Sequence, residues 1–257
     1  MSENLRLQSQ AFPIIRCENP KSGSITFIST PKGIARLLLL CSSKPKRRTR
    51  IKAMAFDFDG TLVDSLDFLA RGWEEIASEL KIYLRTDLRN LVGLTAEQIA
   101  YEISSGEPLL QERLLRKRSE VFEAKRFVNE AKLFPETKGV LKELRRRGFP
   151  LALASSTVAA RLLELADLYK ISDLFDLIIG GDEVARSKPA PDLLLETARR
   201  LQLEPRSLAY VGDTSYDIES SLAAGSVAIL VNRTGSRYEG PDPDFVISNM
   251  EGLHLLL

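Results

Sequence analysis

The sequence predicts an α/β fold, in which a parallel sheet carries helices on both faces and an all-helical insertion follows the first strand. Three observations support this class. Apolar runs of strand length alternate with amphipathic helical segments over residues 134–257. A further apolar run at 51–58 precedes them, and residues 66–132 show helical periodicity without a strand pattern. The expected architecture is a three-layer, Rossmann-like core with an inserted helical cap domain.

Composition divides the chain near residue 50. Residues 1–50 hold ten Lys and Arg against two Glu, whereas the remainder carries 26 basic and 33 acidic residues. We expect 1–50 to be a basic, disordered N-terminal extension, 51–65 and 134–257 to form the catalytic core, and 66–133 to form the cap domain. A mildly acidic body is not typical of nucleic-acid binders, so no nucleic-acid partner is expected.

Targeting signals are weak. The longest apolar run near the start, residues 34–41, is eight residues long and contains Arg36, whereas a membrane span needs about 20. We expect a cytoplasmic protein. An organelle such as the plastid is the alternative, because a Ser-rich, basic, acid-poor start is typical of transit peptides. Cys17 and Cys41 both lie in the extension, so the body has no disulfide. A monomer and a homodimer both remain open.

The elements follow in chain order. After the strand at 51–58, an apolar stripe from Leu66 to Leu80 predicts a helix, and Trp73 on that stripe is expected to pack rather than to bind substrate. The next helices are expected at 87–104 and 107–128. The core then continues with helix 137–147, strand 151–154, helix 158–168, strand 174–179, helix 190–201, strand 208–213, helix 215–224, strand 227–231 and an edge strand at 245–247.

Two aspartates stand where the first strand ends. Asp57 and Asp59 are two residues apart and run into the turn residues Gly60 and Thr61. Side chains at positions i and i+2 of a strand share a side, so we expect both carboxyl groups to point the same way. Two neighbouring carboxylates repel unless a cation or a shared proton compensates them. The pair therefore indicates a metal-assisted site that attacks phosphorus.

Three further polar patches follow strands or open helices. In isolation each has a structural explanation, such as a helix N-cap or a proline at the first helical position. Ligands bind at the carboxyl ends of parallel strands, so the shared position of all four patches predicts a single site. The three patches are Ser155-Ser156, Ser187-Lys188-Pro189-Ala190-Pro191-Asp192 and Gly212-Asp213-Thr214-Ser215-Tyr216-Asp217.

Together, the Asp-Phe-Asp-Gly-Thr-Leu-Val-Asp-Ser segment at 57–65 and these patches resemble the haloacid dehalogenase superfamily over about residues 51–250. The nearest pattern is that of its helical-cap, phosphoglycolate phosphatase-like hydrolases. The resemblance implies Mg²⁺-dependent hydrolysis of a small phosphorylated metabolite through an aspartyl-phosphate. It implies that Asp57 is the nucleophile and Asp59 the general acid and base. The implied metal ligands are Asp57, Asp59 and Asp213, with Asp217 supporting them from the second shell. The implied phosphate-binding residues are Ser155, Ser156, Lys188, Gly60 and Thr61.

Residues that differ between subgroups of the superfamily indicate which reaction this protein catalyses. Dehalogenases lack the second aspartate, so Asp59 argues against carbon–halogen cleavage. Sugar phosphomutases of the superfamily carry a histidine five residues after the position of Asp64, where this chain has Leu69. Hydrolysis is therefore favoured, with a phosphomutase as the alternative. A receiver-like phospho-aspartate module is a rival from another class, but an acid/base beside the acceptor shortens the life of the aspartyl-phosphate.

The cap gives little information on the substrate. Gly93-Leu94-Thr95 resembles the loop that such caps place over the active site. Arg89 and Arg113 are candidates to meet a substrate carboxylate, although solvated helix faces are the favoured reading.

Overall fold

The computed structural model describes residues 16–17, 25–26 and 51–256 of the 257-residue chain. Its main sheet has the strand order β2-β1-β10-β9-β8-β3-β6-β7, in which β10 through β7 are parallel and the two short strands at the β10 edge are antiparallel. The parallel α/β class is thereby confirmed. The strands of this sheet are β1 (Arg16–Cys17), β2 (Ile25–Thr26), β3 (Ala53–Phe56), β6 (Leu151–Ser155), β7 (Leu177–Gly180), β8 (Leu208–Gly212), β9 (Val227–Val231) and β10 (Phe245–Ile247).

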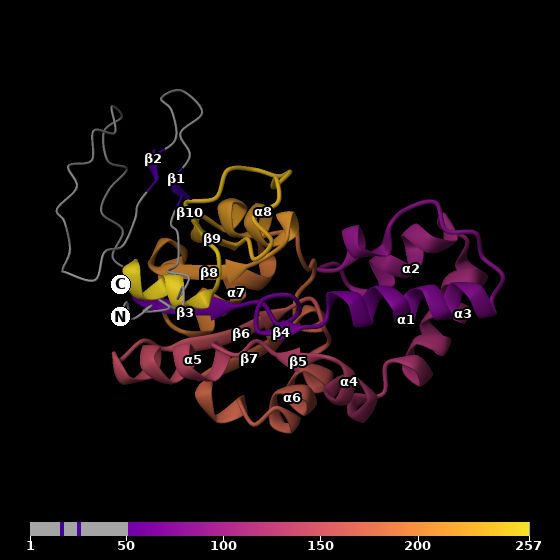
Figure 1. The fold of residues 1–257 in the computed structure, drawn as a ribbon, viewed down its shortest axis with the longest axis horizontal. Helices are drawn as coiled ribbons and strands as arrows, with labels where there is room; N and C mark the ends of the chain where they lie inside the picture. Colours follow the sequence, from indigo (N-terminus) through magenta and orange to yellow (C-terminus); the bar gives the residue numbers. More distant parts are fainter. Residues whose placement is uncertain (1–15, 18–24, 27–50, 257) are drawn as a thin grey trace, which may run out of the picture.

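Helices cover both faces of the sheet (Figure 1). Met54 and Phe56 of β3 pack with α5 (Thr137–Arg146) and α6 (Ala159–Leu168), whereas Ala53 and Ala55 pack with α7 (Asp192–Arg200) on the opposite face. This alternation is the period of two expected of a strand that is buried on both sides. The core helices are α5 (Thr137–Arg146), α6 (Ala159–Leu168), α7 (Asp192–Arg200) and α8 (Ser215–Ala224).

A helical insertion separates β3 from the rest of the core and lies beyond the carboxyl ends of the strands (Figure 1). A two-stranded ribbon marks its base, with Val63 opposite Leu133 and Asp64 opposite Lys132. The expectation that no strand interrupts 66–132 misses the second strand, because two residues are too few for a periodic pattern. The elements are β4 (Val63–Asp64), α1 (Leu66–Glu79), the 3₁₀ helix η1 (Leu88–Leu91), α2 (Ala96–Ser104), α3 (Pro108–Val121), α4 (Ala124–Glu130) and β5 (Lys132–Leu133).

The helix expected at 107–128 is two helices. Phe122 leaves helical geometry with φ −98° and ψ 43°, and the Glu123 side chain accepts hydrogen bonds from the amides of Lys125 and Arg126. A capping carboxylate starts a new helix because it satisfies amides that have no partner in the preceding turn. The break places Phe122 at the end of α3, where its ring packs against Phe68 and Trp73 of α1 and lines the pocket between the insertion and the core.

Aromatic side chains join the insertion to the core. Phe127 of α4 stacks on Phe58 at 6.2 Å between ring centroids, and the Tyr169 hydroxyl donates to the Ala131 carbonyl at 2.7 Å. Trp73 is 2% exposed, which confirms that it packs. Such aromatic pairs are worth about 0.5–1.5 kcal/mol each beyond the area they bury. They hold the insertion over the end of the sheet.

The N-terminal segment contributes to the sheet edge. β1 pairs with β10, with Arg16 opposite Val246, so these strands were not anticipated by the expectation of a disordered extension. The other residues of 1–50, including Cys41 and the basic run before residue 51, lie outside the described residues. Among the described helices, none combines the length and the apolar character that a bilayer span requires.

Candidate active site

The loop after β3 carries the first two acidic residues. The amide of Asp57 donates to the Val211 carbonyl at 2.9 Å, which fixes the start of the loop on the neighbouring strand β8. Gly60 then adopts φ +73°, and its amide donates to the Val63 carbonyl at 2.8 Å. This left-handed residue turns the chain sharply, a conformation that glycine adopts at low cost. As a result, Asp57 and Asp59 line the same pocket, as their spacing predicted.

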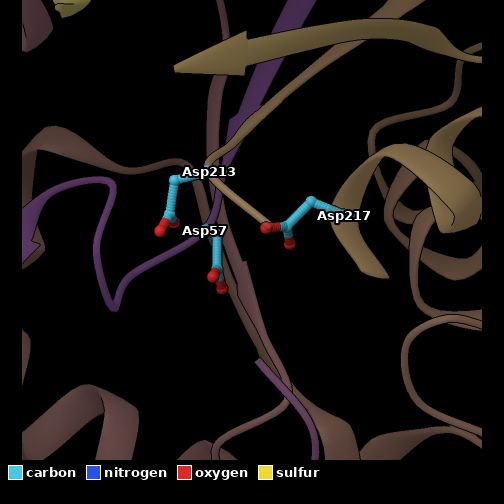
Figure 2. Close-up of side chains that lie close together, drawn as sticks. All are labelled: Asp57, Asp213 and Asp217. Carbon is cyan, nitrogen blue, oxygen red and sulfur yellow. The ribbon is translucent and has the colours of Figure 1, made fainter. Parts of the chain in front are cut away.

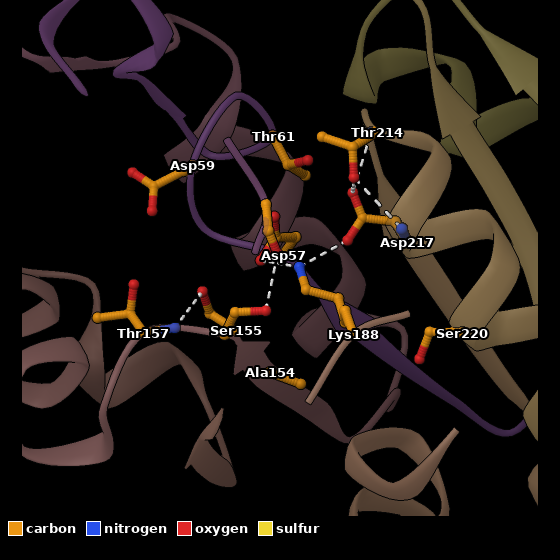
Figure 3. Close-up of polar contacts among 12 residues, drawn as sticks. Asp57, Asp59, Thr61, Ala154, Ser155, Thr157, Lys188, Thr214, Asp217 and Ser220 are labelled. Atoms are coloured by element: carbon orange, nitrogen blue, oxygen red, sulfur yellow. Dashed lines mark hydrogen bonds and ion pairs between the residues drawn. The ribbon is translucent and has the colours of Figure 1, made fainter. Parts of the chain in front are cut away.

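Asp57 forms a buried charged group with Lys188 and Asp217 (Figure 3). The Lys188 ammonium lies 2.8 Å from Asp57 Oδ1 and 2.6 Å from Asp217 Oδ1, and all three side chains are at most 2% exposed. Burial raises the pKa of Asp57 to about 7, because the attraction of Lys188 only partly offsets desolvation and Asp217 adds repulsion. Burial alone would lower the pKa of Lys188, but the flanking carboxylates raise it. Lys188 is therefore a fixed cation.

The start of helix α8 positions Asp217. It is the third residue of α8, where its carboxylate accepts from the Thr214 amide at 2.9 Å and the Thr214 hydroxyl at 2.6 Å. This capping box places the carboxylate at the positive end of the helix. Its other oxygen accepts from Lys188, and the buried Tyr210 hydroxyl lies 3.2 Å from it. Both Asp217 oxygens are thus already engaged.

Asp213 brings a third carboxyl group to the same place. One oxygen each of Asp57, Asp213 and Asp217 lie within 4.8 Å of one another (Figure 2). Thr61 is buried, and its hydroxyl donates to Asp213 Oδ1 at 2.9 Å, so its side chain supports this carboxyl group. Burial raises the pKa of Asp213 well above its usual range, with further repulsion from Asp217 and Asp57. Three acids against one lysine leave an excess of negative charge that a divalent cation would compensate.

Asp59 stands apart from this cluster (Figure 3). Its carboxylate accepts from the buried Ser65 hydroxyl at 2.6 Å, and Ser65 directly precedes α1. Burial raises the pKa of Asp59, and the Ser65 hydrogen bond lowers it in part. A carboxyl group with a raised pKa is suited to hold and release a proton near neutral pH.

Ser155, the last residue of β6, and Ser156 directly after it also line the pocket. The Ser155 hydroxyl oxygen accepts from the Thr157 amide at 3.3 Å. The Ser156 hydroxyl donates to the Gly93 carbonyl at 2.7 Å and accepts from Ser187 at 3.0 Å. The Ser156 side chain is therefore engaged with the insertion rather than available to a phosphate.

Among the described residues, four side chains of the core donate to backbone carbonyls of the insertion, and the Tyr169–Ala131 bond described above is one of them. Besides the Ser156–Gly93 bond, the Tyr216 hydroxyl donates to Asn90 at 3.1 Å, and the Arg161 guanidinium donates to Phe122 at 2.6 Å. Gly93 and Leu94 line the pocket, so the predicted loop does lie over the site. The pocket is thus enclosed between the sheet end and the insertion.

The two arginines considered from the sequence are elsewhere. Arg89 pairs with Asp67 at 3.0 Å and with Asp87 at 3.6 Å on the surface, and Arg113 is exposed. Sequence reasoning missed Arg118, which lines the pocket. A signal existed, because Arg118 falls four residues after the buried Leu114 and so places a charge on the apolar stripe of α3.

Comparisons with known proteins identify the family of this chain. A family model described as haloacid dehalogenase-like hydrolase matches residues 54–231. A curated relative named phosphoglycolate phosphatase, from Aquifex aeolicus, is 30% identical over 212 residues, which are 80% of this chain and 97% of that protein.

Solved structures share the fold. A predicted phosphoglycolate phosphatase from Haemophilus somnus superposes with a TM-score of 0.70 at 22% identity, covering 80% of this chain and 97% of that one. A β-phosphoglucomutase from Clostridium difficile gives a TM-score of 0.64 at 19% identity, covering 76% and 92%. The predicted enzyme class, a hydrolase with phosphatase relatives, is confirmed by the family match and the curated relative. The chain belongs to the haloacid dehalogenase-like hydrolase family.

Proposed function

We propose that this protein is a Mg²⁺-dependent phosphatase that hydrolyses a small phosphomonoester through an aspartyl-phosphate, in the manner of a phosphoglycolate phosphatase. One observation carries the proposal: a buried aspartate lies 2.8 Å from a buried lysine in the same pocket as a second, separately held carboxyl group. These groups supply a nucleophile, a neutralising charge and an acid. Residues 66–133 serve as the cap domain, and residues 51–65 with 134–257 as the catalytic core.

The chain's own residues account for both half-reactions. Asp57 attacks phosphorus, and Lys188 offsets the repulsion between its carboxylate and the phosphate dianion. Asp59 donates its proton to the oxygen of the leaving alcohol as the ester bond breaks. It then takes a proton from the water that attacks the aspartyl-phosphate and regenerates free Asp57.

The phosphate contacts follow from the same loop. Among the described residues the Thr61 amide donates to no carbonyl, so it is available to a phosphoryl oxygen beside the Gly60 turn. The Ser155 hydroxyl adds a donor from the end of β6. Two donors on different strand ends orient the phosphoryl group toward Asp57.

The carboxyl groups fit a magnesium ion. Oxygen ligands are those that Mg²⁺ prefers, and it keeps several waters, so few carboxylates suffice. Asp57 Oδ1 is buried and accepts no well-directed hydrogen bond among the described residues, despite the nearby Lys188. Asp57 and Asp213 would hold the ion with the backbone carbonyl of Asp59, and Asp217 would support them. When bound, Mg²⁺ supplies positive charge against the phosphoryl oxygens.

Hydrolysis is favoured over phosphoryl transfer to a sugar. Leu69 lines the pocket at the place where phosphomutases of the family carry a histidine, and its aliphatic side chain cannot act as a base. A phospho-switch is disfavoured as well, because Asp59 shares the pocket with Asp57 and would shorten the life of the intermediate.

Matched aspartate variants test the mechanism. With Mg²⁺ and 2-phosphoglycolate or p-nitrophenyl phosphate, Asp57→Asn should lose at least about 10³-fold in kcat because an amide is a poor nucleophile. Asp59→Asn should slow turnover by about 10²–10⁴-fold and allow the phosphorylated protein to be detected by intact mass. Asp67→Asn, an exposed surface change, should retain activity. Comparable turnover in Asp57→Asn would remove that residue from the nucleophile role.

A further inference from the structure

Arg118 places a positive charge at the active-site pocket. It belongs to α3 of the insertion and lines the pocket together with Asp57 and Asp59. Among the described residues its side chain makes no hydrogen bond or ion pair, whereas the Arg161 side chain on the core side is bonded to Glu164 and to the Phe122 carbonyl. Its guanidinium instead lies 5.6 Å from the centre of the Phe122 ring. Arg118 is thus held in place with its hydrogen-bond donors unused.

The surroundings of Arg118 favour the binding of an anion. Burial lowers the pKa of Arg118, and the positive charge of Arg161 acts in the same direction. Two carboxyl groups offset the effect only in part: Glu97, at the exposed rim of the pocket and beyond ion-pair distance of Arg118, and Asp59. A partly desolvated guanidinium attracts any anion that enters the pocket, because its five N–H groups can donate hydrogen bonds to it.

We propose that Arg118 binds a second anionic group of the substrate, a carboxylate, and so selects short phosphorylated acids. This inference rests on the proposed phosphatase function. When the phosphoryl group is held at Asp57, the rest of a small substrate must extend toward the insertion, where Arg118 supplies the cationic side chain. A planar guanidinium can donate two parallel hydrogen bonds to a carboxylate.

The rest of the insertion's wall argues against a sugar phosphate. Apart from Arg118, Glu97 and the indole nitrogen of Trp73, the side chains that the insertion contributes are apolar. A polyol would leave several hydroxyl groups without partners there, which costs binding energy for each. A two- or three-carbon acid presents few groups other than the two anions. The apolar residues that the insertion contributes to the pocket are Leu69, Val92, Leu94, Ala96, Ile99 and Phe122.

The test compares two substrates that differ by the carboxylate. We expect the wild-type enzyme to prefer 2-phosphoglycolate over ethyl phosphate, and Arg118→Met to lose about 10- to 100-fold in kcat/KM on 2-phosphoglycolate, mainly through KM. On ethyl phosphate the same variant should lose a much smaller factor. Arg118→Lys should restore part of the preference because it keeps the charge. Arg113→Met, on the exposed face of the same helix, is the matched control.

The results distinguish failure of the Arg118 inference from failure of the proposed phosphatase function. Equal losses on both substrates in Arg118→Met, or no loss on either, would overturn the inference and leave the phosphatase intact. A wild-type preference for 1,3-propanediol bisphosphate over 2-phosphoglycolate, abolished in Arg118→Met, would replace the carboxylate by a second phosphate. Failure of wild-type enzyme to hydrolyse any phosphomonoester with Mg²⁺ would instead sink the proposed function.

Discussion

The Gly60 turn and the Asp213 carboxyl group fill the same small space, which makes Gly60→Ala a sharp test of the site. A Cβ at residue 60 would lie 2.1 Å from Asp213 Oδ2 and 2.6 Å from its Cγ. Ordinary contacts are at least about 3.4 Å, so the carboxyl group must retreat by about 1 Å. Since Thr61 holds that group at 2.9 Å, the retreat also breaks this hydrogen bond.

The magnitude follows from two contributions. A left-handed conformation costs an alanine about 1–2 kcal/mol, and the loss of a hydrogen bond to a charged group about 1.5–3 kcal/mol. The free energy of unfolding of the metal-free protein should therefore fall by about 2.5–5 kcal/mol. Because Asp213 is a proposed metal ligand, the Mg²⁺ concentration for half-maximal activity should rise about 10- to 100-fold.

Gly225→Ala separates the two contributions. Gly225 has φ +72°, nearly the angle of Gly60, but its added Cβ would meet nothing within 4 Å. It should cost only the backbone strain and leave the Mg²⁺ requirement unchanged. Urea unfolding with EDTA measures the stability, and activity against Mg²⁺ concentration measures the metal. If the two variants lost equal stability and kept equal Mg²⁺ dependence, the proximity of Gly60 and Asp213 would have no role in the site.

Three further outcomes are expected. Lys188→Met leaves the buried carboxylates of Asp57 and Asp217 without their cation, so urea unfolding should show a loss of about 3–5 kcal/mol; an unchanged midpoint would contradict the ion-pair assignment. Ser156→Ala removes the hydrogen bond to the Gly93 carbonyl and should raise KM more than it lowers kcat. A kcat effect alone would argue against a role of Ser156 in holding the Gly93 loop over the site. Folded Asp57, with its pKa near 7, binds more protons than an unfolded aspartate, whose pKa is 3.8; metal-free protein should therefore gain stability as pH falls from 7 to 4. Mg²⁺ must displace the proton of Asp57, so it should raise Tm more at pH 8 than at pH 6. A larger increase in Tm at pH 6 would refute the predicted direction of this pH dependence.

The alternation of apolar strands and amphipathic helices was enough to predict the core. Helix α8 and strand β9 begin and end at the expected residues, because each is bounded by a strong local signal such as the capping Thr214 or the terminating Gly225. The division of 107–128 into α3 and α4 was missed, since it depends on a cap at Glu123 within a segment whose charges are typical of one continuous helix.

The sequence by itself predicted the acidic residues and the lysine of the candidate site, because its pattern places each one after an apolar strand or near a helix start, at the end of a parallel sheet. Only the tertiary structure decided where each of these side chains lies relative to the others. It set Asp59 apart from the three clustered carboxyl groups, engaged Ser156 with Gly93, and turned Arg118 into the pocket. These outcomes depend on contacts between segments far apart in the chain, and a local residue pattern carries no information about such distances.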